Sequence, residues 1–213
     1  MNDKNINIYK NYSNRELKGV GEAFELVGCK SPNGINLSVL VMDFLTNEGL
    51  KRDHKFLDIG CGCFRIGKDL INYLDHGHYF GMDGCQNIID QGWTEVLTDE
   101  HHIKGPVVKC SWDFSFEEFG VPSFDFMLAQ SVITHIPEPD VRLLFHKISE
   151  HLSPSGKAFI TYSEGCRTDR DVYAWEKKDL FSFLEGTSLD LHHIGEWGHP
   201  RHQQIFYLSQ VAQ

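Results

Sequence analysis

Short apolar runs alternate with longer amphipathic stretches along most of the chain. Apolar runs bounded by glycine or turn residues predict buried strands, and apolar residues three or four positions apart predict helices. The predicted strands span residues 55–59, 78–82, 106–110, 124–130, 157–162, 189–194 and 204–208. The predicted helices span residues 66–74, 87–97, 139–152 and 174–184, and a turn is predicted at 153–156.

The order of these elements predicts the fold class. Strands that alternate with helices indicate βαβ units and a parallel sheet that is covered on both faces. The last two predicted strands differ, because only residues 195–202 connect them. Since that connection is too short for the usual crossover between parallel strands, this pair should be antiparallel. We therefore predict an α/β fold that ends in an antiparallel pair.

About 50 residues precede the first predicted strand. They contain two amphipathic stretches, Arg15–Val27 and Asn36–Leu50, which we interpret as a helical cap on the sheet. A chain of 213 residues is long enough to bury one full core. We predict a single domain over 1–213, with the cap at about 1–50 and a ligand-binding core over 51–213.

Charge and hydropathy narrow the possible partners. The chain has 20 Lys and Arg against 30 Asp and Glu, a net charge of −10. A non-specific nucleic-acid binder needs a basic surface, so we expect no nucleic-acid partner. No apolar run approaches the roughly 20 residues that span a bilayer, and the N-terminal residues lack the apolar segment of a signal peptide. We expect a cytoplasmic protein with no membrane contact.

The six cysteines are scattered and form no CxxC pair, so we expect reduced thiols. Histidines near the C-terminus, at positions 192, 193, 199 and 202, raise the possibility of a zinc site. A second pair of residues at ligand spacing is missing, and we therefore predict no metal site.

The candidate ligand site follows the first two predicted strands. Ligands of open α/β sheets bind outside the carboxyl ends of the strands. There, Gly60 and Gly62 allow a sharp turn and close approach of the backbone to a ligand, although a tight turn without a ligand also fits. Asp83 ends the second strand, where it would accept the hydroxyls of a ribose or cap a helix. Asp58 would be nearly buried, facing either a ligand cation or backbone donors of the loop.

Four sequence blocks lie in a fixed order between Phe56 and Thr161. They read FLDIGCGCFRIG, YFGMDG, FDFMLAQSVITHIPEPD and HLSPSGKAFIT. In content, order and spacing they resemble the class I S-adenosylmethionine-dependent methyltransferases, in a subgroup whose first block reads GCG-x-[LF]-R-x-G. Phe64 stands where that family usually has a third glycine, and Gly67 supplies a glycine three residues later.

The resemblance implies a Rossmann-like sheet of seven strands in the order 3-2-1-4-5-7-6, with strand 7 antiparallel and helices on both faces. It also implies S-adenosyl-L-methionine as cofactor, with S-adenosyl-L-homocysteine as product. The implied cofactor-binding residues, from the glycine loop to the end of the fourth strand, are Asp58, Gly60, Cys61, Gly62, Asp83, Gly84, Cys85, Trp112, Asp113, Gln130 and Ser131.

These residues have distinct implied roles. Gly60, Cys61 and Gly62 would approach the methionine part and the ribose through their backbone, and Asp83 would hold the ribose hydroxyls. Gly84 and Cys85 would flank the adenine. Asp113 would bind the adenine amine, and Trp112 would stack on the ring or pack in the core. Gln130 and Ser131 would face the methionine end, and Asp58 would face the ammonium of the cofactor.

A hydroxyl acceptor must lose its proton as the methyl group arrives, so a base is expected near the strand ends. His135 is our first candidate, with Glu164, His199 and Arg201 also beyond the predicted strand ends. Each of them also has a structural interpretation. His135 could be a loop histidine bonded to backbone, Glu164 could be a cap, and His199 and Arg201 could belong to a solvated turn.

The resemblance implies methyl transfer as the activity (EC 2.1.1.-). We expect a small-molecule acceptor, with a hydroxyl as the methylated group, because the chain is acidic and carries no appended domain. A non-catalytic methyltransferase-like partner module and a nicotinamide-dependent oxidoreductase are the alternatives. The second is disfavoured because the glycine spacing is not G-x-G-x-x-G and the chain has no second half of the dinucleotide fold.

Overall fold

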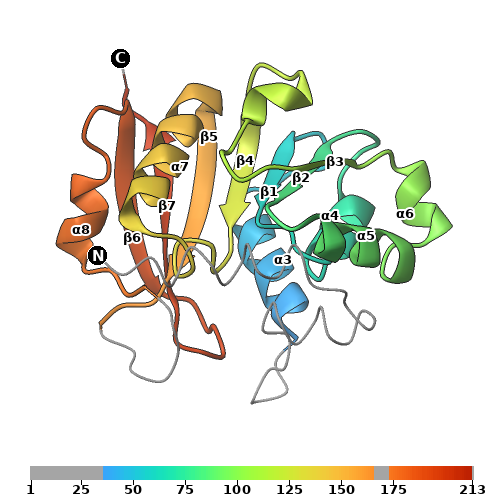
Figure 1. Ribbon diagram of the computed structural model, residues 1–213, viewed down its shortest axis with the longest axis horizontal. Helices are drawn as coiled ribbons and strands as arrows, with labels where there is room; N and C mark the ends of the chain where they lie inside the picture. The colour runs from blue at the N-terminus through green and yellow to red at the C-terminus, as the bar shows by residue number, and fades with distance from the viewer. Residues whose placement is uncertain (1–35, 166–172, 213) are drawn as a thin grey trace.

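The computed structural model describes residues 36–165 and 173–212, which form a layered α/β structure (Figure 1). Seven strands make one sheet in the order β3-β2-β1-β4-β5-β7-β6. Their bounds are β1 Phe56–Ile59, β2 Tyr79–Asp83, β3 Val107–Cys110, β4 Phe124–Ala129, β5 Leu152–Tyr162, β6 Leu189–Glu196 and β7 Gln204–Gln210. Strand β7 is antiparallel to both of its neighbours, and the strands from β1 to β5 are mutually parallel. The predicted fold class and strand order are confirmed.

Helices connect most of the strands. Their bounds are α3 Leu37–Asn47, α4 Gly67–Tyr73, α5 Gln86–Glu95, α6 Asp99–Ile103, α7 Glu138–His151 and α8 Lys177–Ser182, with a 3-10 helix, η1, at Phe116–Phe119. The sequence did not predict α6 or η1, because elements of four or five residues are too short to show a periodic pattern. None of these helices has the length and apolar character that crossing a bilayer requires.

The side chains of the strands alternate between two cores. On one face, Leu57 and Ile59 join the buried side of α7, α8 and η1. Figure 1 shows α7 lying across β5 and β7 on this face. On the other face, Phe56 joins the buried residues of α3, α4 and α5. Both faces of the sheet are therefore covered, as a parallel sheet requires.

Helix α3 lies within the second predicted amphipathic stretch, 36–50. Its side chains Leu37, Val41 and Leu45 are buried in the core between α3, α4 and the sheet. Asn36 caps the helix by accepting a hydrogen bond from the backbone N–H of Ser38 at 3.1 Å. The first stretch, 15–27, lies outside the described residues, so the division into cap and core stays a prediction.

The predicted turn at 153–156 is instead an irregular section of β5. This strand begins at Leu152, directly after α7. Leu152 pairs with Phe124 and Lys157 pairs with Phe126, so the register shifts between these two pairs. The extra residues of β5 bulge away from β4, and a bulge of this kind adds residues to a strand without ending it.

The antiparallel strand β7 brings a distant segment to the ligand edge of the sheet. The carboxyl ends of β1, β2, β4 and β5 share one edge because these strands are parallel. Since β7 is antiparallel to β5, its first residue, Gln204, pairs with Tyr162 near the end of β5. The connection between β6 and β7 therefore lies at the edge where ligands bind in this class of fold.

Helix α5 packs closely on the loop that follows β1. A Cβ atom added at Gly92 would lie 2.6 Å from the Cα atom and 2.7 Å from the carbonyl carbon of Cys63. These are backbone atoms, so the contact cannot be relieved by turning a side chain. Gly92 thus allows the helix and the loop to approach each other.

We expect Gly92→Ala to lower the free energy of unfolding by about 1–3 kcal/mol, because overpacking forces the backbone to shift. Alanine is the better helix former by about 1 kcal/mol, which would act in the opposite direction. Urea unfolding measures the difference. Thr94→Ala, at an exposed position of the same helix, is the control and should change stability little. A stabilised Gly92→Ala protein would contradict the packing argument.

Candidate functional site

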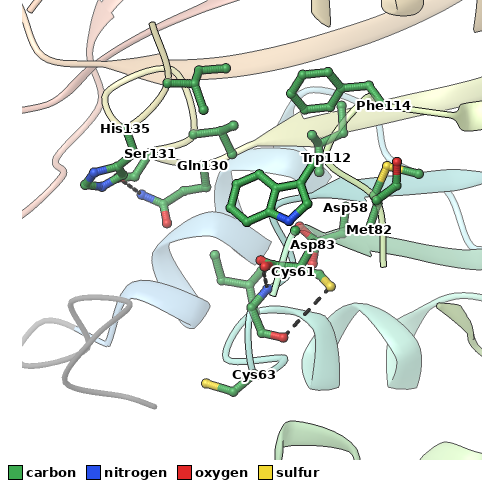
Figure 2. Close-up of a pocket in the computed structure, with 18 of the residues that line it drawn as sticks. Asp58, Cys61, Cys63, Met82, Asp83, Trp112, Phe114, Gln130, Ser131 and His135 are labelled. Atoms are coloured by element: carbon green, nitrogen blue, oxygen red, sulfur yellow. Dashed lines mark hydrogen bonds between the residues drawn. The ribbon is translucent and has the colours of Figure 1, made fainter. Parts of the chain in front are cut away.

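A pocket opens at the carboxyl ends of β1, β2 and β4 (Figure 2). Its empty volume is about 1090 Å³, open solvent at the mouth included. It is lined by residues 58–63, 65, 66, 82–84, 111, 112, 114, 130–132, 135, 136 and 140. Its position outside the carboxyl ends of the strands is where ligands bind in open α/β sheets.

The glycine loop after β1 forms one wall of the pocket. Gly60 and Gly62 have φ angles of 72° and 55°, in the left-handed region that side chains rarely adopt. A Cβ atom at Gly60 would also lie 2.6 Å from the Cγ2 atom of Val132 on the opposite wall. Gly60 is therefore required both by its backbone conformation and by the close approach of the segment that follows β4.

Phe64 keeps the loop conformation without a glycine. Its φ angle is 60°, and its side chain is fully buried. The ring packs in the core with α3 and α4, and contacts the Trp93 ring edge-on at a centroid distance of 6.2 Å. The phenyl ring does not line the pocket. The substitution at the third glycine position thus preserves the left-handed turn and adds a hydrophobic anchor.

Asp83 binds the glycine loop directly. One carboxylate oxygen accepts the backbone N–H of Gly62 at 2.9 Å, and the other accepts the N–H of Cys85 at 2.9 Å. Burial raises the pKa of Asp83, and the N–H groups of Cys85, Gly62 and Gly84 partly offset that effect. Each carboxylate oxygen has a second lone-pair direction, so both oxygens can still accept from a ligand.

Asp58 lies deeper in the pocket and is 4% exposed. Its carboxyl accepts a hydrogen bond from the Tyr79 hydroxyl at 2.8 Å. Burial raises the pKa of Asp58 to about 7, with the Tyr79 hydrogen bond and the Arg65 charge lowering it and Asp83 adding to the rise. A buried carboxyl of this kind is favourable for a ligand cation, which would compensate its charge.

Arg65 was not among the predicted site residues, although it stands in the first sequence block. Its guanidinium lines the pocket near Asp58 and donates to the Oε1 atom of Gln130 at 3.3 Å. Arg65 therefore connects the loop after β1 to the end of β4. Only its position three residues after Gly62 could have signalled this role.

The segment after β4 forms the opposite side of the pocket. Figure 2 shows Gln130, Ser131 and His135 gathered there, away from Trp112 and Phe114. The segment is held by several hydrogen bonds: Thr134 Oγ1 donates to the Ser131 carbonyl at 2.7 Å, and Trp175 Nε1 donates to the Ile133 carbonyl at 2.7 Å. His135 is therefore carried on a braced loop.

Residues 57–160 match the sequence model of a methyltransferase domain, from β1 to β5. The chain belongs to the class I S-adenosylmethionine-dependent methyltransferase family. Methyl transfer is therefore its class of activity. Apart from Phe56 and Thr161 at their outer ends, the match covers the four sequence blocks that carry the resemblance, and it includes all the pocket-lining residues described above.

Solved methyltransferases share the fold at low sequence identity. A magnesium protoporphyrin IX methyltransferase from Synechocystis, crystallised with bound S-adenosylmethionine, is 10% identical with a TM-score of 0.68 over 99% of this chain and 98% of that one. A TehB-like methyltransferase from Corynebacterium glutamicum is 19% identical with a TM-score of 0.61 over 95% and 97%. A methyltransferase from Aquifex aeolicus is 16% identical with a TM-score of 0.65 over 86% and 96%.

The third strand supplies one wall of this methyltransferase pocket. Trp112 is 42% exposed and lies against Gly84, where a Cβ atom would be 2.7 Å from the indole ring. It lines the pocket and is not a core residue. Asp113 does not line it, because its carboxylate accepts the Ser111 and Ser115 hydroxyls in a local turn. Cys85 is buried beside Asp83 and also lies outside the lining.

The methyltransferase fold separates the four candidates beyond the strand ends. His135 lines the pocket, whereas Glu164, His199 and Arg201 do not. Glu164 is exposed just after β5. His199 is 6% exposed and lies behind Gln130, with 3.4 Å between the two Nε2 atoms, and its Nδ1 accepts the backbone N–H of Arg201. Within residues 36–165 and 173–212, no three His, Cys, Asp or Glu side chains are grouped as metal ligands would be.

The raised pKa of Asp58 should make stability depend on pH. The folded protein retains a proton that the unfolded chain releases near the ordinary pKa of 3.8, so the free energy of unfolding falls as pH rises toward about 7. Between pH 5 and 8 this contribution is roughly 2–3 kcal/mol. We expect Asp58→Asn to abolish that part of the fall in urea unfolding. Asp75→Asn, at an exposed carboxyl, should retain it, and an equal fall in Asp58→Asn would contradict the assignment.

Proposed function

We propose that this methyltransferase transfers the methyl group of S-adenosylmethionine to a hydroxyl of a small-molecule acceptor. The observation that carries the proposal is the direct contact between the glycine loop and Asp83, at 2.9 Å from the Gly62 N–H. This contact puts a close backbone turn and a two-sided hydrogen-bond acceptor on the same pocket wall. A nucleoside needs both, because its ribose presents two neighbouring hydroxyls.

The residues present fit the parts of this cofactor. Trp112 and Gly84 offer a flat wall for the adenine ring. Asp83 would accept the ribose hydroxyls. Asp58, which is buried and whose pKa is raised to about 7, would face the ammonium of the amino-acid part, and Gln130 and Ser131, which line the same pocket, would also face that part. The roles proposed for Asp113 and Cys85 have less support, since neither lines the pocket.

The cofactor supplies an activated sulfonium methyl group, so the protein has mainly to bind, orient and exclude water. His135 would accept the hydroxyl proton, a role supported by its position in the pocket lining with Gln130 and Ser131. Glu164 and His199 are less suitable as bases, since they lie outside the lining.

Other observations favour an enzyme that acts on a small molecule. The net charge of −10 is unsuited to a nucleic-acid substrate. The absence of a third loop glycine was the one argument for a non-catalytic module, and Phe64 keeps the left-handed turn that this glycine would provide. The match to methyltransferase domains leaves the oxidoreductase alternative without support.

We expect Asp83→Ala to weaken S-adenosylmethionine binding by about 1.5–3 kcal/mol, the usual contribution of hydrogen bonds to a charged group. Titration calorimetry measures the dissociation constant. Asp83→Asn should lose less, because it keeps one oxygen acceptor. Asp75→Ala, at an exposed surface carboxyl, is the matched control and should bind like the wild type. An unchanged constant in Asp83→Ala would show that this carboxylate only holds the loop.

We expect His135→Ala to lower turnover about 10²–10⁴-fold, the usual effect of losing a general base. Cofactor affinity should change little, since the imidazole would act on the acceptor. The wild-type rate should also fall in acid, because a protonated imidazole cannot accept a proton. A panel of hydroxylated small molecules with labelled cofactor provides the assay. Normal turnover in the variant would place the base elsewhere, and loss of cofactor binding would indicate a structural role.

A further inference from the structure

A buried polar cluster lies behind the side of the pocket formed by Gln130 and Ser131. Its members come from β5 and from the connection between β6 and β7, which the sheet topology brings to this edge. Thr161 is 0% exposed, and Gln203 is 5% exposed. Neither residue lines the pocket. Buried polar groups at such positions are retained only with hydrogen-bond partners, so their contacts indicate what they hold in place.

The side-chain oxygen of Gln203 is the centre of this cluster. It accepts the Ser131 hydroxyl at 2.8 Å and the Thr161 hydroxyl at 3.0 Å. The Nε2 atom of Gln130 approaches the same oxygen at 3.4 Å and donates to the Ser131 hydroxyl oxygen at 2.9 Å. A carbonyl oxygen has two lone pairs, so the two shorter bonds are the principal ones. Gln203 therefore contacts both pocket residues from behind.

The backbone of Ser131 needs this support. Its φ angle is 61°, which is uncommon for a residue with a side chain and costs free energy. Its N–H donates to Thr161 Oγ1 at 2.7 Å, and its hydroxyl donates to Gln203. A strained conformation persists only where the surrounding structure fixes it. Thr161 and Gln203 fix it here, one through the backbone and the other through the side chain.

The same contacts extend to the glycine loop. Gln130 uses its amide nitrogen toward Ser131 and Gln203, which leaves its oxygen directed at the Arg65 guanidinium, 3.3 Å away. If the Gln130 amide turned over, it would present its nitrogen to Arg65, a donor facing a donor. Gln203 thus determines which atom of Gln130 faces the pocket and Arg65.

We propose that Gln203 is a positioning residue for the cofactor, which orders Gln130 and Ser131 to bind the amino-acid part of S-adenosylmethionine. The inference rests on the proposed function, because it takes the ligand and its orientation from there. It adds a residue that the pocket lining does not include and that is separated from Ser131 by 72 positions in the sequence. On the adenosine side of the pocket, the Asp83 carboxylate instead accepts the backbone N–H groups of Gly62 and Cys85.

The test compares two ligands that share the adenosine part. S-adenosylhomocysteine carries the amino-acid part, and 5′-methylthioadenosine lacks it. Gln203→Met keeps most of the side-chain volume and removes the acceptor oxygen. We expect calorimetry to show S-adenosylhomocysteine binding about 10-fold more weakly, on the scale of one or two lost hydrogen bonds. Binding of 5′-methylthioadenosine should stay within about twofold of the wild type, a difference that general loss of structure would not produce.

A matched control and a second pair of variants make the result independent of one substitution. Gln204→Met makes the same change at the next position, whose side chain lies outside the pocket lining, and should bind both ligands normally. Thr161→Val removes the hydroxyl that accepts the Ser131 N–H and should show the same selective loss. Thr161→Ser keeps that hydroxyl and should restore the lost affinity. This pair decides the question even if Gln203→Met does not fold.

The outcomes separate this proposal from the proposed function. A wild-type protein that binds neither ligand refutes the proposed function and this role with it. A wild type that binds both, with no loss of S-adenosylhomocysteine in Gln203→Met and Thr161→Val, overturns the positioning role alone. Equal loss of both ligands in these variants also overturns it, because the cluster would then support the whole pocket and not one end of it.

Discussion

The hydrogen bond from the Gly62 N–H to the Asp83 carboxylate fixes the wall of the pocket that the glycine loop forms. It joins the loop after β1 to the end of β2, two segments that the parallel pairing of these strands already places side by side. The loop reaches this carboxylate only because Gly60 and Gly62 adopt left-handed conformations. The other segments of the pocket pack against this wall: Val132, after β4, fits against Gly60, and Trp112, after β3, fits against Gly84. Each of these two glycines therefore lies where two segments of the pocket come into contact.

Electrostatics adds a second constraint to this geometry. Asp58 and Asp83 both lie in the pocket wall, and burial raises the pKa of both. Asp83 is compensated by backbone N–H groups, whereas Asp58 has the Tyr79 hydroxyl and the nearby Arg65 charge. Two carboxyls with different environments can serve different parts of one ligand: one accepts hydrogen bonds and the other favours a cation.

The sequence predicted the sheet and much of the pocket for a physical reason. Strands β1, β2 and β4 are short, mainly apolar runs that end at or next to glycine, aspartate or glutamine, so the residues that predict the strand are followed directly by residues that can bind a ligand. Asp83 and Gly60 were found in this way. Gln203 and Thr161 were not, because their importance arises from the antiparallel strand β7, which brings residues from the end of the chain behind the end of β4. Asp113 was expected at the pocket, but a local turn with two serines directs its carboxylate elsewhere.

Phe64 has a consequence for the motion of the glycine loop. A loop with glycine at this position could change its backbone angles without disturbing its surroundings. Here the loop residue is also a fully buried core residue, packed with α3 and α4. Opening the loop would withdraw an aromatic ring from the core, so it would require local unfolding of the helices around it. The glycine loop should therefore act as a rigid part of the pocket wall while ligands bind and leave.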